Sequence, residues 1–329
     1  MHVLPAEHHD RDWDAIIVPR PVKERLLAQA LLVLEHGRKL SMLSGLPHGL
    51  IVLAGPTGTG KTTLGRGLAQ VAALALARKG ATTLVEVNPH AFPSDMLGES
   101  QRNVTRLLID TIPEIAARRP YTVVLIDEVE SFAVRRSAAS FEANPVDVHR
   151  ATDAVLLGID EIARKLPSVL FVTTTNFVDA VDEAFLSRAD LVMRFALPDR
   201  ETIEKILASA LTELAVQWPQ LEFLTKDAGK VSELAKLCEG WDGRRIRKLI
   251  LAALAQRLEV ARDPFKLSWD DLLEAARKKG GVEWAGAPAP SSRELFPDVP
   301  RELMHDEDHG HGPHRPTHTH QHDDDAHDH

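Results

Sequence analysis

One stretch of the chain has the residue types and spacing needed to hold a polyphosphate. It directly follows the apolar run 50–54 and consists of Gly55, Pro56, Thr57, Gly58, Thr59, Gly60, Lys61, Thr62 and Thr63. Glycines let a backbone bend around phosphates with its N–H groups pointing inward, and the start of the next helix adds partial positive charge. Lys61 would reach the β and γ phosphates, and the Thr62 hydroxyl would take one position on a magnesium ion. We therefore expect nucleoside triphosphate binding here, rather than a strand-to-helix turn without a ligand.

Three more polar residues follow predicted strands. Asp127 and Glu128 come directly after the apolar strand 121–126, and Asn176 comes after the strand that begins at Val169. Residues at the carboxyl ends of parallel strands share one site. Asp127 would hold magnesium beside Thr62, Glu128 would accept a proton from the attacking water, and Asn176 would orient that water. The alternatives are a solvated loop start for the two acids and a simple turn for Asn176.

Phosphoryl transfer also needs positive charge on the transition state, often from an arginine of a neighbouring subunit. Arg188 is the candidate, with local pairing to Asp190 as the alternative. Arg244, Arg245 and Arg247 begin a predicted helix. One of them could report phosphate occupancy, or they could form a solvated basic helix face.

The elements that position these residues alternate between strand and helix. We predict strands at 50–54, 83–87, 121–126, 169–173 and 191–195, and helices at 22–40, 64–79, 101–118 and 145–166. This alternation predicts an α/β fold with a parallel five-stranded sheet covered on both faces. Residues 13–18 are predicted to be a short extended segment, in which Ile17 either closes over the adenine or packs against the core.

After Pro198 the sequence shows helical periodicity only. Predicted helices cover 199–216, 227–238 and 242–261, and Ser268 to Asp271 opens a further one with a capping-box pattern. We therefore expect an N-terminal linker (1–21), a large α/β domain (22–198), a small all-helical domain (199–280) and a disordered tail (281–329) rich first in Pro and Gly and then in His and Asp.

The composition limits the classes of protein that the chain can belong to. Of 329 residues 44% are hydrophobic, enough for a large core, and the single cysteine excludes an internal disulfide. No apolar run reaches the length of a membrane span and the start lacks the features of a secretory signal, so we expect a cytoplasmic protein without a membrane partner. The net charge is −9, of which −6 lies beyond residue 304. Residues 1–304 therefore carry a net charge of −3 and lack the basic character of nucleic-acid binders, so nucleic acid is not an expected partner.

Together these motifs resemble the AAA+ ATPases and, more closely, the pachytene-checkpoint (thyroid-receptor-interacting) ATPases, which remodel HORMA-domain proteins. The resemblance runs from Trp13 to Leu254. The motifs that carry it are Asn88-Pro89-His90, Gly98-Glu99-Ser100, Ile126-Asp127-Glu128-Val129-Glu130-Ser131, Thr173-Thr174-Thr175-Asn176, Ala184-Phe185-Leu186-Ser187-Arg188-Ala189-Asp190 and Gly240-Trp241-Asp242-Gly243-Arg244.

The resemblance implies a homo-hexameric ring that uses ATP and Mg²⁺ to thread a substrate through its pore. By position, Arg188 becomes the trans-acting arginine finger and Arg244 the sensor in the helical domain. Met96 and Leu97 fall in the pore loop, where the family's usual grip includes an aromatic residue. The family's recognition domain has no counterpart in the roughly 20 residues before the first predicted helix, so recognition is expected from the ring face, the pore or an adaptor.

Bacterial relatives of this family accompany HORMA proteins and nucleotide-second-messenger synthases in anti-phage systems. The resemblance therefore implies that the chain takes apart an activated complex between a HORMA-domain protein and its nucleotidyltransferase. Such activity would restrain the immune signal.

Other functions remain open at this stage. The nine histidines between 305 and 329 could bind zinc, nickel or copper, or could simply be solvated. A phosphate-loop metallochaperone GTPase would use them to store nickel, but no Asn-Lys-x-Asp loop for guanine is present. A DNA-dependent AAA+ loader would be expected to have a basic face, and this sequence shows none. A scaffold that binds nucleotide without turnover would not need Glu128 and Arg188, which are both present.

Overall fold

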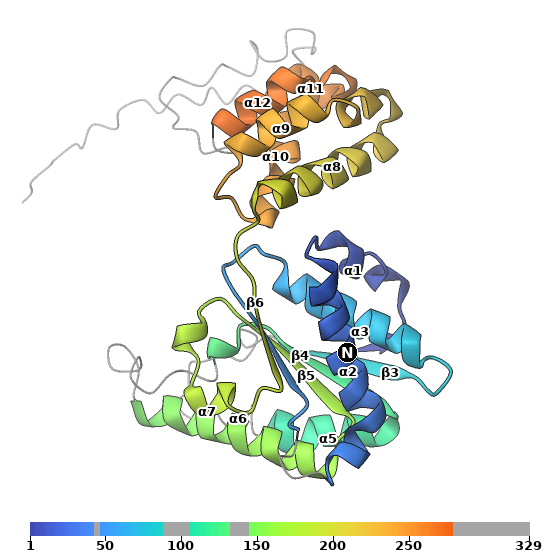
Figure 1. Cartoon of the computed structure of the whole chain (residues 1–329), viewed down its shortest axis with the longest axis vertical. Helices are drawn as coiled ribbons and strands as arrows, with labels where there is room; N and C mark the ends of the chain where they lie inside the picture. Colours follow the sequence, from blue (N-terminus) through green and yellow to red (C-terminus); the bar gives the residue numbers. More distant parts are fainter. Residues whose placement is uncertain (43–46, 88–105, 132–144, 279–329) are drawn as a thin grey trace, which may run out of the picture. The chain divides into compact units, whose positions relative to one another are not determined.

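A computed structural model describes residues 1–42, 47–87, 106–131 and 145–278 of the chain, with side chains given for all of these except 145–151 and 180 (Figure 1). Its centre is a six-stranded sheet with the strand order β1-β3-β4-β5-β2-β6. The strands are β1 (His2–Leu4), β2 (Leu50–Ala54), β3 (Thr82–Val87), β4 (Tyr121–Ile126), β5 (Val169–Thr175) and β6 (Leu191–Arg194). The last five are parallel, which confirms the predicted sheet.

Strand β1 was not predicted and pairs with the edge of β3 in antiparallel fashion. Its three residues are too few to show the alternation that identifies a strand. Strand β1 is anchored at its last residue, Leu4, whose side chain is buried among residues of the neighbouring helices.

Helices cover both faces of the sheet (Figure 1). On one face α2 (Arg20–Leu40) and α3 (Lys61–Leu76) pack against alternate strand residues such as Ile51 and Leu53. The other face, which includes Leu50 and Val52, packs against the π-helix η3 (Leu107–Thr111) and its continuation α5 (Ile112–Arg118), α6 (Pro145–Lys165) and α7 (Glu183–Leu186). Burial on both faces explains why these strands read as continuous apolar runs.

The chain after β6 is helical and has an apolar cluster of its own. Its helices are α8 (Arg200–Gln217), α9 (Ala228–Leu237), α10 (Gly243–Ala255), α11 (Leu258–Arg262) and α12 (Trp269–Arg277), with 3-10 turns at Pro219–Thr225 and Pro264–Lys266. Asp199, Asp227, Asp242 and Ser268 cap helix starts with their side chains, and the predicted capping box at Ser268 is present.

Two predicted elements are wrong. The segment 13–18 is not wholly extended, because Asp12–Ala15 forms the short helix α1. Gly67 lets the Trp13 backbone approach α3, and Lys23 donates to the Trp13 carbonyl at 2.5 Å, so tertiary contacts override the local signal. The predicted helix 242–261 is two helices, because Arg257 adopts an extended backbone and pairs with Asp271 of α12.

The described residues, which end at 278, belong to one compact unit. The proposed division of this unit at residue 198 stays a prediction, and the predicted disordered tail lies beyond the described residues. Within the ranges that the structure describes, no helix combines the length and the apolar character required to cross a bilayer.

Candidate functional site

The glycine-rich loop leads from β2 into α3, whose first residue is Lys61. Gly58 and Gly60 have φ angles of 76° and 86°, in the region that favours glycine. A Cβ on Gly60 would lie 2.4 Å from Cδ1 of Ile16, and one on Gly58 would lie 2.0 Å from Oδ1 of Asp242. The loop therefore owes its path to both backbone freedom and the lack of side chains at these contacts.

Lys61 is only 6% exposed and its ammonium group lies inside the loop. Nζ donates to the carbonyl oxygens of Gly55 and Pro56 at 2.7 and 2.8 Å and to Oδ1 of Asn176 at 3.0 Å. Burial lowers the pKa of Lys61, and nearby carboxylates act in the opposite direction. The lysine of the loop and the amide after β5 thus meet, although 115 positions separate them.

Thr62 and Asp127 also meet, as expected for a shared magnesium site. Thr62 Oγ1 donates to Asp127 Oδ1 at 2.7 Å, and the Thr174 hydroxyl donates to the same oxygen. A hydroxyl and a carboxylate are hard oxygen ligands of the kind that Mg²⁺ takes. The residues present therefore fit this ion.

Glu128 has the unusual φ of 52° for a residue with a side chain. Its N–H donates to Thr174 Oγ1 at 3.0 Å, and its carboxylate Oε1 accepts from Asn176 Nδ2 at 3.0 Å. The backbone N–H of Asn176 donates to Glu130 Oε1 at 3.0 Å. These bonds hold Glu128 in a strained conformation beside Asn176, and such strain is common at functional sites.

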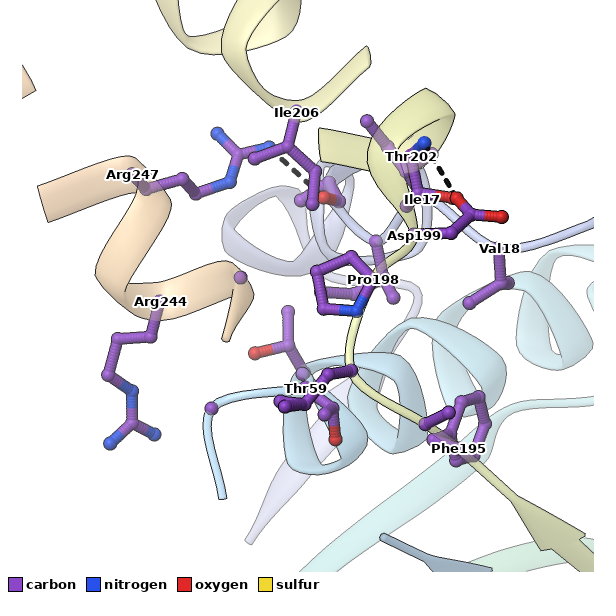
Figure 2. A pocket seen from close by; sticks show the side chains of 18 of the residues that line it. Ile17, Val18, Thr59, Phe195, Pro198, Asp199, Thr202, Ile206, Arg244 and Arg247 are labelled. Atoms are coloured by element: carbon purple, nitrogen blue, oxygen red, sulfur yellow. Dashed lines mark hydrogen bonds between the residues drawn. The ribbon is translucent and has the colours of Figure 1, made fainter. Parts of the chain in front are cut away.

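A cavity of about 730 Å³ lies beside the glycine-rich loop (Figure 2). Most of its walls are apolar, while Thr59, Asp199, Thr202 and Arg244 supply polar groups. A mostly apolar cavity with a few polar groups is typical of a site for an aromatic base. Ile17 lies in the lining, as expected, and its contact with adenine stays a prediction. Other apolar lining residues labelled in Figure 2 are Val18, Phe195, Pro198 and Ile206.

Of the three arginines at the start of α10, Arg244 and Arg247 line this cavity (Figure 2). The backbone N–H of Arg244 also donates to the carbonyl of Gly58 at 3.1 Å. Arg247 donates to Glu213 at 3.0 Å and to the carbonyl of Ala15 at 3.1 Å, whereas the Arg245 guanidinium lies 4.0 Å from the ring centroid of Trp241. The predicted sensor Arg244 thus belongs to a helix start that touches the glycine-rich loop.

Arg188 is bound outside this set of residues. Its Nε and Nη2 donate to the two carboxylate oxygens of Asp160 in α6 at 2.7 and 2.9 Å. This pair raises the pKa of Arg188 and lowers that of Asp160. The alternative pairing with Asp190 is wrong, because that carboxylate accepts from the backbone N–H groups of His48 and Leu50 instead. The other predicted contact residues, Met96 and Leu97, lie outside the described residues.

Sequence reasoning missed three residues that hold the predicted ones. Thr174 binds both Asp127 and the backbone of Glu128, Glu130 binds the backbone of Asn176, and Asp160 binds Arg188. Thr174 could have been found, because period-two alternation places it on the same side of β5 as position 176. Glu130 lies in the motif 126–131 that carries the family resemblance, but no local pattern predicts its contact with Asn176 or that of Asp160 with Arg188, since both contacts depend on the fold.

Comparison with known proteins gives a family match over the centre of the chain. Residues 51–197 match the model of the ATPase family associated with various cellular activities (AAA). CD-NTase-associated protein 6 from Pseudomonas aeruginosa is 45% identical over 266 residues, which cover 81% of this chain and 86% of that protein. The Pachytene checkpoint protein 2 homolog of Rattus norvegicus is 34% identical over 279 residues, which cover 78% of this chain but only 64% of the rat protein.

Solved structures with the same fold include C. elegans PCH-2. It matches with a TM-score of 0.68 and 27% identity over 84% of this chain and 74% of that one. A chain of the E. coli MS115-1 HORMA:CdnC:Trip13 complex matches with a TM-score of 0.64, covering 88% of this chain and 95% of that one. Its identity is 23%, so this second likeness bears on the fold alone.

Proposed function

We propose a function for this chain on the premise that it belongs to the AAA family of ATPases and, within it, to the group of CD-NTase-associated protein 6 and the Pachytene checkpoint protein 2 homologs. In this function the chain hydrolyses ATP to take apart a complex between a HORMA-domain protein and a nucleotidyltransferase that makes a second messenger. Its action restrains anti-phage signalling. The name of the Pseudomonas relative, which couples that protein to a CD-NTase, supports the choice of partner.

The observation that carries the catalytic part is the hydrogen-bonded series from Lys61 through Asn176 to Glu128. Lys61 binds the β and γ phosphates, which replace the carbonyl oxygens that its ammonium group contacts in this structure. Asn176 orients the attacking water, and Glu128 accepts its proton. Thr62 and Asp127 would hold Mg²⁺, which supplies charge neutralisation on the phosphates. The adenine occupies the apolar cavity against Ile17.

Arg188 acts on the nucleotide of the neighbouring subunit in a homo-hexameric ring. Within its own chain it is paired with Asp160 and bound to elements away from Lys61, which supports a role across an interface. Arg244 reports the state of the nucleotide to the helical region 199–280. Met96 and Leu97 grip the substrate in the pore by shape and apolar contact.

The test is to mix the chain and ATP with a purified HORMA–nucleotidyltransferase complex and to follow the complex by gel filtration. We expect it to dissociate with ATP, and to stay bound to the ATPase when Glu128→Gln replaces the parent. A complex that persists while the parent hydrolyses ATP would reject the remodelling function. Stimulation of hydrolysis by DNA instead would favour a DNA-dependent machine.

A further inference from the structure

The turn after β1 brings three histidines together. His2 belongs to β1, and His8 and His9 belong to the short 3-10 helix Glu7–His9. One ring nitrogen from each lies within 4.8 Å of the other two. The ring centroids are 4.0 Å apart for His8 and His9, 5.2 Å for His2 and His8, and 5.7 Å for His2 and His9.

His9 is the buried member of this group, at 5% exposed. Its Nδ1 lies 2.8 Å from Asp12 Oδ2, and since an ionised carboxylate only accepts, Nδ1 carries the proton. The other nitrogen, Nε2, then presents a lone pair, and it is buried without a hydrogen-bond partner in the described part of the chain. An unsatisfied buried acceptor is costly unless something binds it. A carboxylate on the far nitrogen is also the usual support of a metal-binding histidine.

The backbone around the three histidines is held by contacts that do not involve their rings. β1 pairs with β3, and the side chain of Gln70 in α3 binds both the N–H and the carbonyl of Ala6 at 3.0 and 3.1 Å and Asp10 at 2.6 Å. The Glu86 carboxylate lies 3.7 Å from Nε2 of His2 and adds negative charge. The rings are therefore presented by a framework that already exists.

We propose that His2, His8 and His9 bind one divalent transition-metal ion of the zinc type. Imidazole nitrogens suit Zn²⁺, Cu²⁺ and Ni²⁺, and three protein ligands with an open position are a known arrangement for zinc. Nitrogens at about 2 Å from the ion lie about 3.3 Å apart in a tetrahedral site, so the rings must draw together. His2 and His8 can do so because both are partly or fully exposed. The ion would clamp β1 to the turn that follows it.

The test uses the full chain with the nine histidines of 305–329 replaced by alanine, so that the tail cannot bind metal. Competition with a chromophoric chelator measures Zn²⁺ affinity, and Co²⁺ absorption reports tetrahedral coordination. We expect one ion per chain. His8→Gln and His9→Gln should each weaken binding by more than about 10-fold, and Asp12→Asn by about 10-fold through the lost support of His9. His36→Gln, at an exposed histidine beside a glutamate, is the matched control and should bind as the parent does.

Loss of the buried ring in His9→Gln could lower stability, so thermal unfolding in EDTA is measured for each variant. His8 is exposed, and its replacement should leave unfolding in EDTA unchanged while abolishing the Co²⁺ spectrum. Absence of Zn²⁺ binding in the parent, or unchanged affinity in both His8→Gln and His9→Gln, would overturn the proposal.

Discussion

The cluster formed by Lys61, Thr62, Asp127, Glu128 and Asn176 and the pair formed by Arg188 and Asp160 both hold charge in partly buried surroundings, but they differ in their partners. In the cluster the ammonium of Lys61 is bound by neutral carbonyl and amide oxygens. In the pair a guanidinium meets a carboxylate through two hydrogen bonds. Neutral partners can be exchanged for phosphate without leaving an opposite charge unpaired, whereas separating the ion pair leaves one. Under the proposed function, the first region can take its phosphate directly, whereas Arg188 must first leave Asp160.

The largest effect is expected when the pair formed by Arg188 and Asp160 is broken. Arg188→Ala should lower ATP hydrolysis by about 10³-fold or more, because an arginine finger contributes that much, while nucleotide affinity stays close to that of the parent. The control is Arg164→Ala, an exposed arginine on the same helix as Asp160, which should hydrolyse normally.

Mixing two inactive chains sharpens this prediction. A mixture of Arg188→Ala and Glu128→Gln chains contains interfaces with both groups intact, so part of the hydrolysis should return if the arginine acts across subunits. If no mixing ratio restores activity, Arg188 does not act in trans.

The next effect concerns the first region. Glu128→Gln should lower the rate of hydrolysis by about 10²- to 10⁴-fold through loss of the proton acceptor. Binding of a fluorescent ATP analogue should persist, because glutamine can still accept from Asn176. Lys61→Ala should instead lose binding, and equal loss of binding in both variants would contradict the separate roles.

A smaller effect is expected when Thr174, which binds both Asp127 and Glu128, is replaced. Thr174→Val removes the hydroxyl that binds Asp127 and the Glu128 backbone, and we expect hydrolysis to fall about 10-fold for the loss of about 1–2 kcal/mol of positioning. Thr173→Val is the matched control, since the neighbouring hydroxyl makes only a 3.4 Å bond to the Ile51 carbonyl. Similar rates for the two variants would show that Thr174 has no special part.

The smallest effect is on stability. Asp160→Asn should lower the free energy of unfolding at pH 7 by about 1 kcal/mol or less, because the pair is partly exposed. Arg188 lowers the pKa of Asp160 below its ordinary 3.8, so this stabilisation is complete above that value and is lost as the pH falls through the depressed pKa. Chemical unfolding from pH 7 to pH 3 should show the difference between parent and variant shrinking below about pH 4; a constant difference would argue against the ion pair as its source.

The sequence predicted the parts of the fold that are set by local pattern. The buried strand 121–126 and the glycine-rich loop before α3 were confirmed because continuous apolar runs and glycines act over short distances. The family resemblance was confirmed by the comparisons as well. The clustering of Asp127 and Asn176 could be foreseen because parallel strands end at one edge.

What the sequence did not predict depends on contacts between distant residues. The helix at Asp12–Ala15 depends on Gly67 and Lys23, and the break at Arg257 depends on Asp271. The partner of Arg188 lies 28 positions away in α6, where no local pattern distinguishes Asp160 from other acids. Each of these contacts exists only after the chain has folded.

The hydrogen bond from the Arg244 N–H to the Gly58 carbonyl joins main chain to main chain. This bond is kept with any residue at position 244 that has a backbone N–H, so most substitutions of Arg244 leave the connection between the loop and α10 in place. Proline is the exception, because it lacks the donor yet is tolerated in the first turn of a helix. Arg244→Pro would thus remove this bond between α10 and the loop, which removal of the guanidinium alone cannot do.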